Sequence, residues 1–159
     1  MSTSLLLLAL GAGAGTMTGI VLYRALAARK RYFSELARFI DYVISDLKYR
    51  RTDVVTLRGG FVSADDALST NLDEWLNGLE SGQRKLTRGK LKKTEVNEVE
   101  AILFGVGQVD LESQLFELAA AKEKVAAMQV AAQQRFDKYG ALYIKLGLLA
   151  GLALGILLM

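Results

Sequence analysis

The sequence predicts an all-α protein, in which a cytoplasmic helical bundle is flanked by N- and C-terminal transmembrane helices. The 159 residues include no proline, so no position carries the ring that interrupts a helix. Charge is segregated as well: none of the 20 basic and 17 acidic residues precedes Arg24, and only Lys145 follows Lys138. Between these ends, apolar residues recur at steps of three and four, which is the period of an amphipathic helix.

The first predicted membrane span is residues 4–23, which carry no charge. At about 1.5 Å per residue this stretch covers roughly 30 Å, the thickness of a bilayer core. A secretory signal peptide would carry its positive charge before the apolar run, whereas here Arg24, Arg29 and Lys30 follow it. The positive-inside rule then places the N-terminus outside and the chain from Arg24 onward in the cytoplasm.

The second predicted span is residues 142–159, of which residues 146–159 are uninterruptedly apolar. This run is short, so we expect Lys145 to extend its ammonium group toward the cytoplasmic interface. Tyr139 and Tyr143 would lie in the interfacial belt of aromatic residues. Both ends of the chain therefore predict two spans in a cell membrane, with both termini outside.

Each span carries small residues spaced four apart, so that they line one helix face and allow close backbone approach. Such faces can pack as a hairpin within one chain or between chains in a homo-oligomer. A third possibility is that glycine is simply common in membrane helices. The six glycines are Gly11, Gly15, Gly19, Gly147, Gly151 and Gly155.

The body between the spans, residues 24–138, is expected to be a cytoplasmic helical domain. An amphipathic helix is predicted over residues 24–50. Residues 52–62 contain Gly59-Gly60 and are predicted to form a turn or a short connector. The apolar stripe of the helix predicted over residues 24–50 is Phe33, Leu36, Ile40, Val43, Ile44 and Leu47.

A second amphipathic helix follows the sequence SADD at residues 63–66, which resembles a capping box that begins at Ser63. Gly82 is predicted to end this helix. Its stripe is Leu68, Leu72, Trp75, Leu76 and Leu79.

Residues 83–93 form a basic stretch that can be interpreted in several ways. It can be a solvated flexible loop, or it can contact anionic lipid, an acidic protein or a nucleic acid. The stretch has no aromatic residue that would stack on a base and no RNA-binding motif, so we expect no nucleic-acid partner. Its six cations are Arg84, Lys85, Arg88, Lys90, Lys92 and Lys93.

Two further helices are predicted in the second half of the body. Thr94 is expected to cap the first of them, and Gly105 and Gly107 to break it. Asp110 is expected to cap the last helix, whose seam leads directly into the second span. That seam is Leu111, Leu115, Leu118, Ala121, Val125, Met128, Ala132, Phe136 and Tyr139.

The composition excludes several kinds of chemistry. Histidine and cysteine are both absent, which excludes disulfides, thiolate or imidazole metal sites and Cys or His nucleophile systems. The sequence GQRKLTRGK at residues 82–90 lacks the order of a phosphate-binding loop. We therefore expect no catalytic residue, no metal site and no cofactor.

The Phe104-Gly105 pair is followed by Asp110, by Gln114 and by a terminal apolar helix from Tyr139. Near the front of the chain stands the segment FIDYVISDLKYRRT at residues 39–52. Together with the order of anchor, helical body and terminal anchor, these features resemble the stage III sporulation protein AB family of endospore-forming bacteria. In that segment the matching positions are Asp46, Leu47, Tyr49 and Thr52.

The chain also departs from the family pattern at three points. The loop between Gly105 and Asp110 is shorter than usual. Asp53 stands where the family has proline. Residues 54–93 are abridged and match the family pattern poorly.

The resemblance implies a non-enzymatic component of the complex between mother cell and forespore, in the mother-cell membrane around the forespore. It implies as partners other sporulation-complex membrane proteins and a cytoplasmic secretion-type ATPase, for which Arg84–Lys93 is a candidate contact. The family's cytoplasmic domain is similar to the inner-membrane platform proteins of type II secretion and type IV pilus machines. A platform of such a machine, or a self-associating helical scaffold, remains an alternative.

Overall fold

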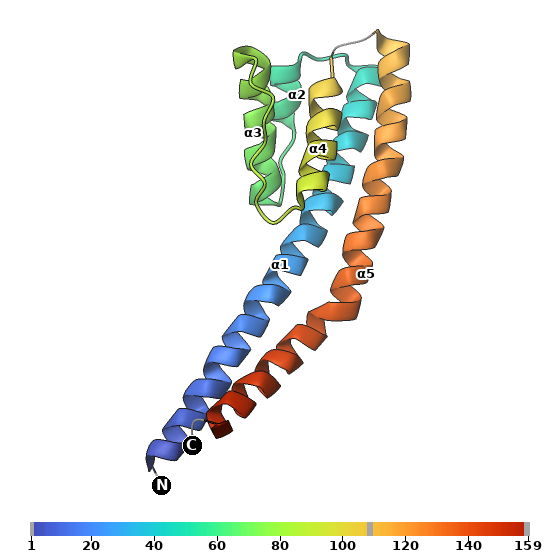
Figure 1. Cartoon of the computed structure of the whole chain (residues 1–159). Coiled ribbons are helices and arrows are strands. Elements are labelled where there is room, and N and C mark those ends of the chain that lie inside the picture. The colour runs from blue at the N-terminus through green and yellow to red at the C-terminus, as the bar shows by residue number, and fades with distance from the viewer. Residues whose placement is uncertain (1, 108–109, 158–159) are drawn as a thin grey trace. The chain divides into compact units, whose positions relative to one another are not determined.

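The computed structural model describes residues 2–107 and 110–157, with side chains from residue 9 onward, and these residues form five helices and no strand. The expectation of an all-helical chain is thereby confirmed. In chain order the helices are α1 (Ser2–Tyr49), α2 (Val54–Gly60), α3 (Asp66–Ser81), α4 (Lys93–Gly105) and α5 (Leu111–Leu157) (Figure 1).

The chain divides into two compact units. Unit 1 comprises Met1–Lys30 and Ala131–Met159, and unit 2 comprises Arg31–Val130. Helices α1 and α5 each contribute residues to both units. The domain limits 4–23, 24–138 and 142–159 inferred from charge remain a prediction.

The core of unit 2 forms around the apolar face of α1. Phe33, Leu36, Ile40 and Val43 of the predicted stripe are at most 1% exposed. The ring of Phe39 packs edge-on against Trp75 of α3, with ring centroids 5.9 Å apart. Burying such a side chain contributes about 1.5–3 kcal/mol, so this face fixes the packing of α3 on α1.

The expected connector at residues 52–62 is wrong, because residues Val54–Gly60 form helix α2. Asp53 caps this helix: its carboxylate accepts hydrogen bonds from the Thr56 backbone N–H at 3.2 Å and from the Thr56 hydroxyl at 2.6 Å. Leu57 is 3% exposed and anchors the short helix in the core. The stabilisation from this cap and from one buried leucine thus exceeds the destabilising effect of the two glycines at the end of the helix.

Two predicted caps are displaced along the chain. Helix α3 is capped by Asp65, whose carboxylate accepts from the Leu68 N–H at 3.1 Å, and not by Ser63. Helix α4 begins at Lys93 with Lys92 as its N-cap, so Thr94 lies inside the helix. There the Glu95 carboxylate accepts from the backbone N–H of Lys92 at 2.9 Å. In both places a carboxylate, and not the predicted hydroxyl, accepts from a backbone N–H at the start of the helix.

The other predicted helix ends are confirmed. Gly82 ends α3 in the left-handed region, with φ 75°, and its N–H donates to the Gly78 carbonyl. Helix α4 ends at Gly105. Asp110 caps α5 by accepting from the Ser113 N–H at 3.2 Å. The loop that precedes Asp110 includes residues 108–109, which lie outside the described residues.

The predicted seam of α5 is buried in its middle. Leu118, Ala121 and Val125 are buried in unit 2, and Ala132 is buried in unit 1. The remaining seam residues are half-buried. A single apolar stripe along α5 therefore contributes buried residues to both units.

Candidate functional site

The glycine faces of α1 and α5 meet backbone to backbone in unit 1. A Cβ atom on Gly11 would lie 2.6 Å from the carbonyl oxygen of Gly151 and 3.0 Å from the Cα of Gly155. A Cβ atom on Gly15 would lie even closer to the carbonyl oxygen of Gly147. Side-chain atoms do not approach a backbone this closely, so these positions admit only glycine.

Gly19, the third glycine of the repeat in α1, also lies close to the α5 backbone, whereas Gly13, which lies outside the repeat, does not. A Cβ atom on Gly19 would lie 2.6 Å from the carbonyl oxygen of Tyr143, whereas one on Gly13 would meet nothing within 4 Å. The close approach is therefore confined to the face that carries the four-residue repeat. In this structure the two faces cover each other within one chain.

Beyond the glycine faces, α1 and α5 also contact each other in unit 1 through aromatic side chains and a cation. The rings of Tyr23 and Phe136 have centroids 5.3 Å apart. The Lys30 ammonium group lies 4.9 Å from the centroid of Phe136, within the range of a cation–π interaction. Tyr139 and Tyr143 stack with centroids 6.1 Å apart.

Helix α5 is long and apolar enough to cross a membrane, judged by its length and composition. Its most apolar stretch has a mean hydropathy of 1.9, and only 17% of that stretch is buried within the protein. Of the described helices, α5 alone meets this criterion. The first expected span, residues 4–23, lies partly outside the described side chains, and two spans remain a prediction.

The basic stretch lies between α3 and α4 and is held in place in unit 2. Leu86 and Leu91 are 4% and 5% exposed and pack into the core. The Leu86 N–H donates to a carboxylate oxygen of Glu100 at 2.8 Å, and the Thr87 N–H donates to Glu74 at 2.6 Å. All six of its cationic side chains are exposed. The segment therefore presents its charges from a fixed backbone.

A groove between α4 and α5 in unit 2 was not foreseen from the sequence. It has a volume of about 260 Å³, and small residues such as Ala101, Gly105 and Ala121 leave it open. Gln114 lines it, is 5% exposed, and its Nε2 atom has no hydrogen-bond partner. The groove is smaller than the roughly 300–1,000 Å³ of most small-molecule sites, so it suits a side chain better than a cofactor.

The shifted pKa values in unit 2 have structural causes. Burial raises the pKa of Tyr32 well above its ordinary value, although a hydrogen bond from the Asn71 amide at 2.7 Å partly offsets this. The pKa of Asp53 is lowered by hydrogen bonds from Thr56, and that of Asp110 by hydrogen bonds from Ser113. Among the described residues, no cluster of carboxylates has the arrangement of a metal site.

These observations define an all-helical protein whose C-terminal helix is apolar enough to cross a membrane. The family model for stage III sporulation protein AB matches residues 64–159, so the chain belongs to this family and is a sporulation protein. The family prediction is confirmed. Comparisons with curated proteins and with solved structures found no match.

The extent of the family match refines the resemblance seen in the sequence. The match includes Phe104, Asp110, Gln114 and the terminal helix, which carried the resemblance. It also includes residues 64–93, which belong to the stretch that departs from the family pattern. Residues 39–52 lie outside the match, so their likeness to the family remains a prediction.

Proposed function

We propose that this protein is a non-enzymatic platform component of the sporulation complex between mother cell and forespore. In this role it couples a cytoplasmic secretion-type ATPase to the membrane proteins of the complex. Family membership supports the sporulation role, and the apolar α5 supports anchoring in a membrane.

The main support for this proposal is that two helices each contribute residues to both units. Helix α1 spans Ser2–Tyr49 and helix α5 spans Leu111–Leu157, and each contributes to the glycine-lined unit 1 and to the core of unit 2. A partner that acts on unit 2 would therefore act on the same helices that anchor the chain. This connectivity suits a protein that transmits motion to a membrane assembly.

The proposed topology has two spans in the mother-cell membrane, unit 2 in the cytoplasm and both termini outside. The cations that follow residue 23 support this orientation. The chain has no cysteine, so Lys85→Cys creates a unique thiol on the exposed basic stretch. In vegetative cells that express the chain in their outer cell membrane, we expect an impermeant thiol reagent to label this residue only after the cells are opened. Labelling in intact cells would overturn the orientation.

Copurification tests the coupling role. An affinity tag in the segment between α2 and α3, at Val62, which is 81% exposed, should recover a secretion-type ATPase and other sporulation membrane proteins from sporulating cells. An unrelated two-span membrane protein with the same tag is the control. Recovery of neither kind of partner, from a tagged chain that still supports sporulation, would refute the proposal.

A further inference from the structure

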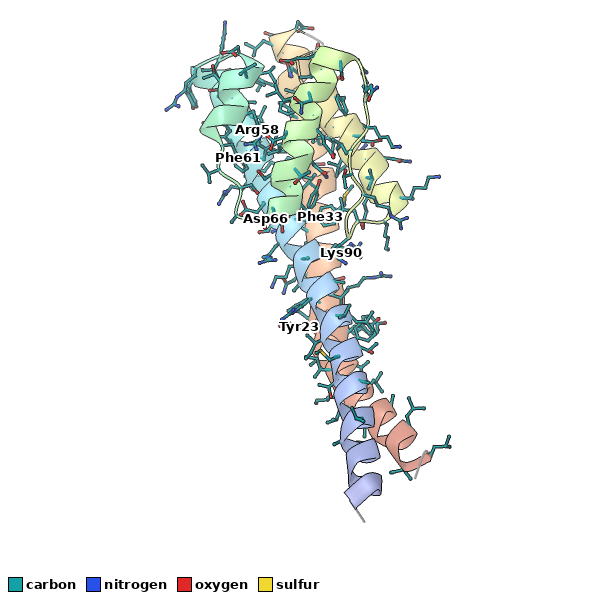
Figure 2. All side chains as sticks on the ribbon, turned by 90° about the vertical axis from the view of Figure 1, so that its left-hand side faces the viewer. Tyr23, Phe33, Arg58, Phe61, Asp66 and Lys90 are labelled. Atoms are coloured by element: carbon teal, nitrogen blue, oxygen red, sulfur yellow. The ribbon has the colours of Figure 1, made fainter. Side chains whose placement is uncertain are left out.

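Five of the six cations of the basic stretch fall into two groups at opposite ends of unit 2, and Arg88 lies between the groups in the sequence. Arg84 and Lys85 follow the C-terminal end of α3, and Lys85 lies in a hollow beside Asn77 and Ser81. The segment then returns along α3. Figure 2 shows Lys90 at the end of the unit where α3 begins at Asp66.

The end of unit 2 that carries Lys90 is also the end where α1 enters the unit. Nε of Arg31 lies 3.9 Å from Oδ2 of Asp65, the residue that caps α3, and the Arg31 side chain is 70% exposed. Asp65 is itself only 5% exposed, which leaves Asp66 as the exposed carboxylate at the start of α3. We call Arg31, Lys90, Lys92 and Lys93 the basic end.

The lysines of the basic end are open to solvent. Lys90, Lys92 and Lys93 are exposed, and among the described residues no salt bridge joins them to a carboxylate. The nearby Glu95 side chain is buried and accepts from the backbone of Lys92. The three lysines of this end therefore present their charge to solvent, whereas Arg31 is paired with Asp65.

Chain connectivity keeps the basic end within reach of the membrane. Arg31 follows Tyr23, the last residue of the first expected span, by eight residues. Eight residues cover about 12 Å as a helix and at most roughly 28 Å fully extended. The cytoplasmic leaflet carries anionic lipids, and its negative potential acts on basic groups within a Debye length of about 10 Å.

The chemistry of the basic stretch favours a lipid over a protein partner. Energetically important protein contacts are enriched in Trp, Tyr and Arg and lie in well-packed pockets from which water is excluded. Residues 83–93 contain no aromatic residue, and their two leucines are already buried in the core. What remains exposed is cationic, which is sufficient for anionic headgroups but offers no apolar anchor to a protein.

We propose that the basic end binds the anionic phospholipid headgroups of the membrane in which the chain is anchored. Arg84 and Lys85, at the opposite end of unit 2, take no part. This inference rests on the membrane anchoring of the proposed function, but it does not depend on the ATPase.

The test uses the full chain in nanodiscs of phosphatidylcholine, with or without phosphatidylglycerol. A donor dye is attached at Thr94→Cys, beside Lys93, and energy transfer to an acceptor on lipid headgroups is measured. We expect transfer to be greater with phosphatidylglycerol and to fall at high salt. The same dye at Tyr49→Cys, at the last residue of α1, should report no change with lipid composition.

Two charge-matched double variants localise the contact. Lys90→Gln/Lys93→Gln should lower the ratio of docked to undocked chains with phosphatidylglycerol by roughly fivefold per charge removed. Arg84→Gln/Lys85→Gln should leave it unchanged. Equal loss in both variants would overturn the proposal in favour of net charge alone.

Two other results would also overturn the lipid assignment. One is energy transfer that does not depend on phosphatidylglycerol. The other is loss of copurified sporulation proteins in Lys90→Gln/Lys93→Gln without a change in energy transfer, which would make the basic end a protein contact. Failure of both the ATPase and the other sporulation membrane proteins to copurify would refute the proposed function but leave the lipid measurement intact.

Discussion

Asp46 on α1 accepts two hydrogen bonds from Thr52, one from its backbone N–H at 3.0 Å and one from its hydroxyl at 2.7 Å. The backbone carbonyl of Asp46 accepts from the N–H groups of Arg50 and Arg51, both at 2.8 Å. Arg51 adopts the left-handed conformation, with φ 56°, in which the helix ends. One buried aspartate therefore organises the whole turn that closes α1.

Replacing Asp46 is expected to destabilise unit 2. Asp46→Ala leaves the two donors of Thr52 without an acceptor, which costs about 1–3 kcal/mol of unfolding free energy. Urea unfolding of the full chain in detergent, followed by the fluorescence of the buried Trp75, measures this change. Asp41→Ala is the control, because its ion pair with Lys122 is exposed and contributes little. Equal losses in the two variants would contradict this role for Asp46.

Tyr32 is expected to make the stability of unit 2 depend on alkaline pH. Burial raises the pKa of Tyr32 above its ordinary value of 10.0, so the native state holds the phenol neutral. The resulting stabilisation is complete below about pH 10 and is lost as the pH rises above it, with a slope of up to about 1.4 kcal/mol per pH unit.

Unfolding measurements on Tyr32→Phe isolate this effect from the titration of lysines. At neutral pH the variant should be less stable by about 1–3 kcal/mol, because the Asn71 amide loses its acceptor. Above pH 10 the difference from the natural chain should shrink, since phenylalanine does not ionise. Tyr49→Phe, at an 83% exposed position, should show neither effect. A difference that stays constant with pH would contradict the prediction.

The contact between glycine faces predicts a sharp contrast between two neighbouring positions. Gly15→Leu should force α1 and α5 apart in unit 1, because a Cβ atom there collides with the backbone of Gly147. Gly13→Leu should be tolerated, because the space beside Gly13 is open. Crosslinking of Tyr23→Cys to Phe136→Cys by a short bifunctional thiol reagent is the readout, since the centroids of the two rings lie 5.3 Å apart in unit 1, and it should fall several-fold only in Gly15→Leu. Unchanged crosslinking in that variant would show that the faces do not pack within one chain.

Apolar periodicity predicted the faces that form the core, because burial of a long stripe determines which side of a helix is covered. Phe33 on α1, Trp75 on α3 and Val125 on α5 all belong to predicted stripes and are fully buried. Helix α2 escaped prediction because its seven residues make fewer than two turns. At that length no period can be read, and its stability depends on Leu57 reaching the core.

The contacts that define the candidate surfaces depend on three-dimensional packing. The spacing of Gly15 and Gly151 indicated a packing face but was equally consistent with packing between chains. The six cations formed one stretch in the sequence, and only the return of the chain along α3 separates Lys85 from Lys90. The groove at Gln114 arises from small residues on two helices, a pattern that neither helix displays alone.

The unpartnered amide of Gln114 predicts a stabilising substitution. Nε2 is buried without an acceptor, and an unsatisfied buried donor costs about 1–3 kcal/mol. Gln114→Met keeps a similar length and removes the amide, so the free energy of unfolding should rise by about 1 kcal/mol. Gln129→Met is the control, because that amide donates to Ser34 at 3.4 Å and its loss should bring no gain. A loss of stability in Gln114→Met would show that the amide is satisfied in solution.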